Sequence, residues 1–449
     1  MNAPSRLLPF LREPHRARVA CGLLIAIGVV LAVLTRPWFG DDVAQVEDKN
    51  FIHFYEAARA LLEHRDPYRA AGGGYIYPPF LAVALMPLAA LDWVTAGRIW
   101  ACLVAAGLLG VILLSAHDSR RRVGAVPDAF GFSVVAFAAV LLSARAIKHQ
   151  IGEGQSDYLV AGAFVLALVC LDRCPTLAGL VLGLAANVKY HTLIVLPYLL
   201  VRRRYRAAAS TLASTILFAL APALVIGWDR TFAFWRTALG GLGGLSGRPD
   251  SQAGVPTRED APAFSNLYDV FWEHSLSLTS VLARVLREAG LADHDGSGTG
   301  LVFIGTALLA ALLFALGCGL YRAHGVPFPL TRPPDDHRTR DLVGIEWWGL
   351  VVGILALSPQ THHRHLLLML GMGAFAVAFL LTGGVRGRTA LFAAIACFAL
   401  SLLKFESWSE PLADVWRFVG GPILALLVLY FVLLSAVLRR RAADAQRHT

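Results

Sequence analysis

Residues 47–79 read EDKNFIHFYEAARALLEHRDPYRAAGGGYIYPP, a polar and aromatic segment between two long apolar runs. Within it, apolar and aromatic side chains recur at helical spacing from residue 51 to residue 62, and acidic side chains fall on the opposite face. This pattern predicts an amphipathic helix suited to lying on a membrane surface. The flanking runs, residues 19–35 and 96–116, approach the length that crosses a bilayer. The chain is therefore expected to cross the membrane both before and after this segment.

The composition is that of a membrane protein. The chain has 449 residues, 56% of them hydrophobic and 16% charged, and its mean hydropathy is +0.59. Repeated apolar runs of this kind predict an all-α polytopic membrane protein, here a single integral membrane domain over residues 1–449. The first run lacks a small-residue cleavage site, and we interpret it as a signal anchor.

The net charge of +9 does not indicate nucleic acid as a partner. The arginines gather at the ends of apolar runs, where the positive-inside rule places them, so membrane lipids are the expected surroundings. The six cysteines lie in or beside apolar segments, which is typical of small core residues and not of a disulfide framework.

The apolar runs and their flanking arginines predict about twelve transmembrane helices, with both termini in the cytoplasm. The clear runs after the first two are 129–143, 158–171, 208–227, 301–321, 345–357, 366–381, 390–403 and 418–438. A shorter run, residues 80–91, is interpreted as an interfacial helix, because Arg120, Arg121 and Arg122 then remain cytoplasmic. Residues 37–95 form the first outer loop in this topology.

The largest outer loop covers residues 228–300. A glycine-rich stretch, residues 239–254, is expected to be flexible, and residues 278–285 carry a second amphipathic helical pattern. No internal repeat is visible, which counts against the transporter folds that are built from repeats.

Residues 176–201 predict a hairpin of two half-length helices that meet at residues 187–189 and reach the outer side. Lys189 lies at the tip, followed by His191. A lysine in an apolar run costs ~3 kcal/mol near the bilayer centre, so a compensating partner is expected. Lys189 either snorkels to the headgroups or binds the phosphate of a lipid-linked substrate, and the broken helix favours the phosphate.

Two further polar turns face the same side. Residues 151–157, IGEGQSD, contain glycines that allow a close backbone approach to a ligand, although a tight turn explains them equally well. Residues 358–365, SPQTHHRH, carry arginine and histidine side chains able to neutralise a phosphate leaving group. The histidines also raise the question of a metal, but no carboxylate has matching spacing, so no metal ligand is assigned. No cofactor is assigned, and a divalent cation stays an open alternative.

Acidic residues stand immediately before the aromatic helix of the first outer loop. Asp48 is either the general base of a reaction or an N-cap of the helix, while Asn50 is better explained as the cap. The same residue types serve both purposes in this position, so the pattern alone leaves both roles open for Asp48.

Four segments, in order and at plausible spacing over residues 50–370, resemble glycosyltransferase family 87. They are FYEAARALLEHRDPY…YIYPPFLAVALMPLAAL, GEGQSDYLVAGAFVLAL, GLAANVKYHTLIVLPYLLVRRRYR and SPQTHHRHLLLML. This family comprises polyprenyl-phosphate-mannose-dependent mannosyltransferases, including enzymes of phosphatidylinositol mannoside synthesis.

The resemblance implies the GT-C glycosyltransferase fold in a bacterial plasma membrane, with the active site on the extracytoplasmic side. It also implies a polyprenyl-phosphate sugar as donor, a lipid or glycan as acceptor, and an acid of the first outer loop as general base. The family usually has an aspartate directly before the aromatic helix, where this chain has Asn50. We therefore expect Asp48 to be the catalytic base. The residues expected to bind substrate are Asn50, Tyr55, Tyr77, Gln155, Lys189, His191, His362, His363 and Arg364.

The expected reaction is an inverting sugar transfer. A carboxylate removes the proton of the acceptor hydroxyl as its oxygen attacks the anomeric carbon, and polyprenyl phosphate departs from the opposite face. A transporter or flippase of a lipid-linked sugar is the main rival, and a non-catalytic family member is a third possibility because of Asn50. The polar residues gather toward one face beside long outer loops, which favours the enzyme.

Overall fold

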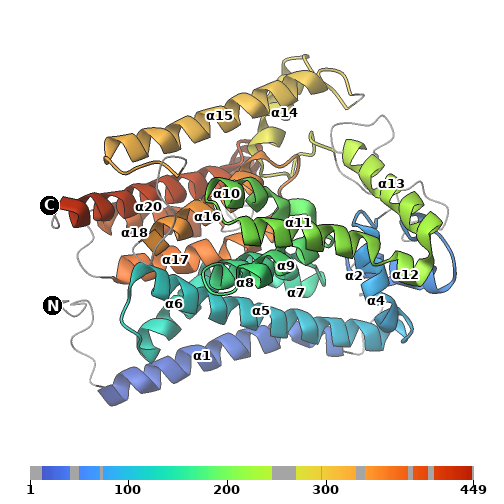
Figure 1. The fold of residues 1–449 in the computed structure, drawn as a ribbon, viewed down its shortest axis with the longest axis horizontal. Coiled ribbons are helices and arrows are strands. Elements are labelled where there is room, and N and C mark those ends of the chain that lie inside the picture. The colour runs from blue at the N-terminus through green and yellow to red at the C-terminus, as the bar shows by residue number, and fades with distance from the viewer. Residues whose placement is uncertain are drawn as a thin grey trace.

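The computed structural model describes residues 13–40, 50–70, 74–244, 269–294, 296–329, 339–382, 388–402 and 409–446. Within these ranges the regular structure is entirely helical. Long helices run side by side through the molecule, among them α1 (Glu13–Thr35), α5 (Trp93–Val123), α15 (Thr299–Ala323) and α20 (Gly421–Gln446), as Figure 1 shows.

Seven helical segments in the described part of the chain are long and apolar enough to cross a membrane. They are Glu13–Phe39, Trp93–Val123, Ala129–Glu153, Tyr205–Ile226, Thr299–Ala323, His363–Leu381 and Gly421–Gln446. The prediction of an all-α polytopic membrane protein is confirmed. The number of about twelve spans stays a prediction, because the remaining apolar helices, such as Pro79–Ala89 and Pro175–Ala186, are shorter.

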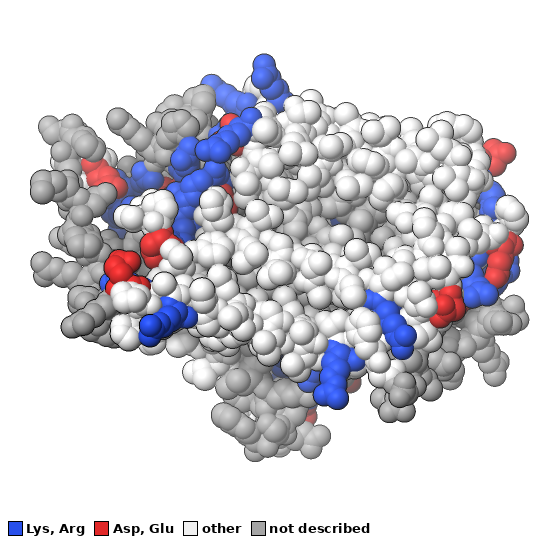
Figure 2. Space-filling model, turned by 90° about the horizontal axis from the view of Figure 1, so that it is seen from below, with Lys and Arg blue, Asp and Glu red and all other residues white. Residues whose placement is uncertain are grey.

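Arginine side chains cluster at one end of the bundle, in the last turn of α5 and near the end of α20. The start of α1 and the end of α20 lie at the same end (Figure 1), which we call the basic end. Ion pairs between distant segments lie there, from Arg204 to Asp172 at 2.9 Å and from Arg441 to Asp341, whereas Arg122 and Asp118, 2.6 Å apart, pair within α5. Figure 2 shows charged side chains gathered mainly toward the edges of one face, around a wide uncharged surface. Such a surface is expected where helices contact lipid tails.

The opposite end, the loop end, carries α2 (Phe51–Leu62) and α4 (Pro79–Ala89), which pack on each other. The predicted amphipathic helix of the first loop is confirmed as α2. Its apolar face, however, is buried in the protein: Phe51 stacks on Trp93 and Trp100 with ring centroids 5.3 and 5.4 Å apart. The expectation that this face lies on the membrane is therefore wrong, because aromatic residues at the start of α5 cover it.

The second large loop also differs in part from expectation. Helix α13 (Trp228–Gly244) includes the first glycines of the stretch predicted to be flexible, and the rest of that stretch lies outside the described residues. Helix α14 (Leu278–Glu288) confirms the second amphipathic pattern. Its polar side is the buried one, because the Arg284 guanidinium donates to the carbonyls of Trp272 and Phe418, whereas Val285 on the apolar side is 47% exposed.

The predicted hairpin is present as α9 (Pro175–Ala186), a break, the short 3-10 helix η3 (Tyr190–Ile194) and α10 (Val195–Val201). Two glycines of α9, Gly179 and Gly183, face α11 (Tyr205–Leu220) so closely that an added Cβ at residue 183 would lie 2.6 Å from the Thr211 carbonyl oxygen. Small residues permit this close packing of helices in a membrane. The Asn187 amide closes the break by donating to the carbonyls of Gly183 and Thr215, at 2.9 and 3.0 Å.

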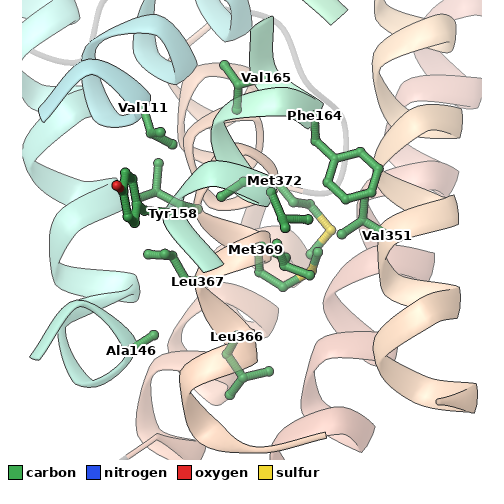
Figure 3. Close-up of a cluster of buried hydrophobic side chains, with 14 of the residues drawn as sticks. Val111, Ala146, Tyr158, Phe164, Val165, Val351, Leu366, Leu367, Met369 and Met372 are labelled. Carbon is green, nitrogen blue, oxygen red and sulfur yellow. The ribbon is translucent and has the colours of Figure 1, made fainter. Parts of the chain in front are cut away.

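The main hydrophobic core is next to the polar turn of residues 358–365. Figure 3 shows side chains of α5, α8 (Asp157–Cys170), α16 (Arg340–Leu357) and the segment from η5 (His363–Met369) into α17 (Leu370–Leu381) meeting in one apolar cluster. Leu366 and Leu367 are buried in it directly after Arg364 and His365. The core therefore fixes the backbone from which these polar side chains extend.

Candidate active site

The break in the hairpin places Lys189 in an extended conformation just before η3. Its Nζ donates to Asp157 Oδ1 at 2.5 Å and lies 5.3 Å from the centre of the Tyr77 ring. The Asp157 side chain is 1% exposed and begins α8, where the helix dipole stabilises a negative charge. The expected partner of Lys189 is therefore a buried carboxylate, which the sequence interpretation did not assign to the site.

A second carboxylate, Glu153, joins three segments that are distant in the sequence. Its Oε2 accepts from Asn50 Nδ2 at 2.8 Å, from Gln155 Nε2 at 3.2 Å and from Arg364 Nη1 at 3.3 Å. Its carbonyl also accepts from the Phe51 N–H at 3.1 Å. Asn50 occupies the N-cap position of α2 but makes no side-chain cap bond, because its amide is used by Glu153. The expected capping role of the Asn50 side chain is thus wrong.

Two tryptophan side chains fix the backbone of the turn that carries Glu153. Trp38 and Trp100 donate their indole N–H groups to the carbonyls of Ile151 and Gly154, both at 2.8 Å. Gly154 has φ +66°, and an added Cβ would lie 2.8 Å from the Cβ of Phe51. A glycine is therefore required at position 154, both by the conformation of the turn and by the close approach of α2.

Histidine side chains gather next to Lys189 and Arg364. The rings of His362 and His365 have centroids 5.2 Å apart, and His191 lies 6.3 Å from His365. His362 also packs on Trp272 with centroids 4.2 Å apart. Burial, together with the positive charge of Arg364, holds the pKa of His362 well below its usual value, so its imidazole is uncharged at neutral pH.

These groups form one end of a cavity of about 1010 Å³. Its polar end is lined by Tyr77, Lys189, His191, His362, Arg364 and His365. From there the cavity continues as an apolar groove lined by residues of α10, α15, α16 and α20. The positions of these helices can be followed in Figure 1. Its walls include Leu313, Phe314, Leu350, Ile354, Leu427 and Phe431.

The groove has a second polar feature nearer the basic end. Glu346 of α16 accepts hydrogen bonds from the hydroxyls of Tyr198 and Tyr321, at 2.8 and 2.7 Å, and all three residues line the cavity. The polar groups are therefore not confined to the loop end, contrary to the sequence interpretation. An isolated glutamate at the edge of an apolar run gave no indication of its two phenol partners.

The predicted site residues divide into those that the structure brings together and those that it does not. Tyr77, Lys189, His191, His362 and Arg364 line the cavity. Asn50 and Gln155 join them through Glu153.

The other predicted residues lie elsewhere. The Tyr55 hydroxyl donates to the Leu91 carbonyl at 2.8 Å, in the core beneath α2. His363 is part-buried but is not among the cavity-lining residues. Asp48 lies outside the described residues.

One feature of the sequence could have indicated Glu153 and Asp157 as site residues. Both belong to a short turn between two apolar runs, where an acid needs a partner to offset the cost of leaving water. In the part of the chain that the structure describes, no group of three His, Cys, Asp or Glu side chains is placed to hold a metal ion.

Comparison with known proteins identifies relatives of the central part of the chain. The sequence model of glycosyltransferase family 87 matches residues 75–330, more than half of the chain. A polyprenol-phosphate-mannose-dependent alpha-(1-2)-phosphatidylinositol pentamannoside mannosyltransferase of Mycobacterium tuberculosis (strain CDC 1551 / Oshkosh) is 26% identical over 234 residues, which cover 49% of this chain and 51% of the relative.

Two other relatives give a similar result. A polyprenol-phosphate-mannose-dependent alpha-(1-2)-phosphatidylinositol mannoside mannosyltransferase of Mycobacterium tuberculosis (strain ATCC 25618 / H37Rv) is 28% identical, over 49% of this chain and 54% of the relative. A pentamannoside mannosyltransferase of Mycolicibacterium smegmatis is 29% identical over 31% of this chain and 32% of the relative. The chain thus spans about half the length, or less, of the curated relatives that it matches.

Proposed function

Because this chain belongs to glycosyltransferase family 87, we propose that it moves a hexose from a polyprenyl-phosphate donor to a lipid or glycan acceptor. The names of its relatives favour mannose as the sugar and a lipid-linked mannoside as the acceptor. The reaction takes place at the loop end, which we assign to the extracytoplasmic side of a bacterial plasma membrane. The basic end is then cytoplasmic, in keeping with the positive-inside rule.

The observation that carries this proposal is the continuity of the cavity. Its polar end presents the cations Lys189 and Arg364, and the apolar groove begins directly beside them. Along α16, the distance from Ser358 to Glu346 corresponds to ~18 Å at 1.5 Å per residue. A cavity of this shape suits an amphiphile with an anionic head and a long hydrocarbon chain.

The cations at the polar end stabilise the leaving group. The donor is a phosphodiester, and its departure as a phosphate monoester increases the negative charge at the polar end. A cation at ~4 Å interacts with that charge by about 4 kcal/mol at an effective dielectric of 20. Arg364 is suited to this role because its Nε is buried without a partner among the described residues.

A carboxylate at the mouth of the cavity takes the proton of the acceptor hydroxyl. Asp48, in the first loop, is the candidate that the sequence indicates, and its role stays a prediction because it lies outside the described residues. Asn50, two residues further on, touches the polar end through Glu153.

A flippase for a lipid-linked sugar is the second candidate. The observation in its favour is Glu346, a polar group far along the groove toward the basic end. A flippase must carry its polar head past that point, whereas the transferase leaves the head at Lys189 and Arg364. Membership of a glycosyltransferase family favours the transferase.

The test is transfer by the purified protein, using radiolabelled polyprenyl-phosphate mannose and phosphatidylinositol mannosides, with the glycolipid product separated by chromatography. A groove variant shows whether the donor chain binds where the cavity lies. At Gly353, which lines the groove, an added Cβ meets nothing within 4 Å. Gly353→Leu should therefore occupy the groove without disturbing the helices.

Losing the burial of two methylene groups of the donor costs about 1.6 kcal/mol, so the donor KM should rise roughly tenfold. Gly22→Leu, at an equally open position on α1 outside the cavity, is the matched control and should leave KM unchanged. Equal donor KM values for both variants would show that the donor chain does not bind in the groove. Movement of the lipid between leaflets without any sugar transfer would support the flippase.

A further inference from the structure

We infer that Glu153 is the general base of this chain, and that Asn50 holds its carboxylate in place. The inference rests on the proposed function, and it names the residue that takes the acceptor proton.

The contacts place Glu153 at the junction of the acceptor side and the donor side. Arg364 Nη1 lies 3.3 Å from Glu153 Oε2, and the same arginine lines the polar end of the cavity. One guanidinium therefore has the carboxylate on one edge and faces the donor phosphate with the remainder of its donors. In an inverting transfer, base and leaving group lie on opposite sides of the anomeric carbon, and a bridging arginine is able to separate them in this way.

Exposure distinguishes Glu153 from the other acid in contact with these cations. The Asp157 side chain is 1% exposed and is paired with Lys189, so an acceptor hydroxyl has no route to it. The Glu153 side chain is 30% exposed and lies in the turn between α7 (Ala144–Gly152) and α8. Its Oε1 lies 2.8 Å from Nδ1 of His149, whose side chain is itself 37% exposed, so an acceptor arriving from the loop end can approach the carboxylate on the His149 side.

The amide at position 50 follows from this arrangement. Asn50 Nδ2 donates to Glu153 Oε2 at 2.8 Å, a bond that an aspartate at the same place would replace with two carboxylates in contact. A chain that carries its base on residue 153 therefore needs an amide on residue 50. The sequence departure that raised the question of a non-catalytic protein has, in this inference, a catalytic explanation.

The step is balanced without a further reactant. The acceptor O–H bond breaks as its oxygen forms a bond to the anomeric carbon, and the proton moves to a Glu153 carboxylate oxygen. The bond between the anomeric carbon and the phosphate oxygen breaks, and polyprenyl phosphate leaves with that electron pair. The protonated Glu153 then releases its proton to water at the loop end.

The first experiment is Glu153→Gln in the full-length protein, assayed with polyprenyl-phosphate mannose and a phosphatidylinositol mannoside. We expect kcat to fall by about 10²-fold or more, because the amide cannot accept the proton. The donor KM should stay within about threefold of the wild-type value, since the amide still hydrogen-bonds Arg364. Glu63→Gln is the matched control: it lies at the far end of α2, is exposed, and should change neither constant.

The second experiment places the carboxylate at position 50 and the amide at position 153. The double variant Asn50→Asp with Glu153→Gln exchanges acid and amide over the same 2.8 Å hydrogen bond. It should recover at least about tenfold of the lost kcat. If Glu153 served only to hold Arg364, the single variant Glu153→Gln would keep its kcat, and the double variant would have no loss to recover.

Three results would overturn the inference. Glu153→Gln with wild-type kcat and a raised donor KM would make Glu153 a positioning residue. Full activity of Glu153→Gln together with a dead Asp48→Asn would return the base to Asp48 and leave the proposed function intact. Absence of transfer by the wild-type protein would overturn the proposed function itself, and this inference with it.

Discussion

Lys189 and Asp157 form a buried ion pair that determines how the role of the lysine must be tested. Removing one partner of a buried pair leaves an uncompensated charge and destabilises a protein by ~3 kcal/mol or more. Lys189→Met should therefore lower the melting temperature of the purified protein as well as raise its donor KM. The measurement is thermal unfolding in detergent beside the transfer assay.

A second substitution separates the two effects. Lys189→Met combined with Asp157→Asn removes both charges and should regain most of the thermal stability while the donor KM stays high. Lys148→Met, at an exposed lysine of α7, is the control and should change neither quantity. A double variant with normal donor KM would show that Lys189 only balances Asp157 and does not hold the phosphate.

At the scale of single residues, sequence patterns indicated the cations that line the cavity but not the anions that pair with them. Lys189 stands out because it interrupts an apolar run, and Arg364 because it follows two histidines. Glu153 and Asp157 appear in the sequence as parts of a short polar turn. Their roles depend on contacts with residues 32 to 211 positions away, such as Lys189 and Arg364, and no local pattern encodes such contacts.

At the scale of elements, the site depends on the close packing of α9 against α11. Gly183→Val should destabilise the hairpin, because the new Cβ would lie 2.6 Å from the Thr211 carbonyl oxygen and would also meet the Ser214 hydroxyl. Overpacking of this kind costs about 1–3 kcal/mol, and a shifted α9 also moves Lys189. Thermal unfolding and the donor KM are the two measurements.

Gly22→Val on α1 provides the comparison, since nothing lies within 4 Å of a Cβ added there. It introduces the same β-branched side chain into a membrane helix that does not form the cavity. Equal melting temperatures for the two variants would mean that α9 and α11 tolerate a wider spacing than the structure shows.

Helix positions were largely predictable, but the side that each helix buries was not. The 3.6-residue pattern located α2 and α14 because it depends only on neighbouring residues. Burial depends on tertiary partners: Trp93 and Trp100 cover the aromatic face of α2, and the C-terminal carbonyls of α19 (Glu410–Phe418) receive Arg284 from the polar face of α14. Both partners lie far from these helices in the sequence, so an amphipathic pattern alone assigned the wrong face to the membrane for α2.

At the scale of the whole molecule, the cavity connects two chemically different ends. At one end the cations of Lys189 and Arg364 line the cavity, while their carboxylate partners Asp157 and Glu153 do not. The carboxylate of Glu346 lines the groove on the side of the basic end. An anionic head is attracted to the first and repelled by the second, so a lipid phosphate is expected to enter the cavity in one orientation. The direction of that orientation across the membrane then decides from which leaflet the donor is taken.

Cysteine labelling tests which side the loop end faces. In a variant that lacks the six native cysteines, a single cysteine is introduced at one of two exposed positions. One is Arg69, whose side chain is 73% exposed near α2, and the other is Val126, which is 71% exposed between α5 and α6 (Ala129–Leu142) at the basic end. In intact bacterial cells, a membrane-impermeant maleimide should label Arg69→Cys and should reach Val126→Cys only after permeabilisation. The physical reason is the excess of arginine at the basic end, which the positive-inside rule retains in the cytoplasm.

The reverse labelling would place Lys189, Arg364 and Glu153 on the cytoplasmic side, and the donor would then have to enter from the inner leaflet. Sugar transfer would remain possible in that case, but its product would appear inside the cell, which assays of right-side-out and inverted vesicles distinguish.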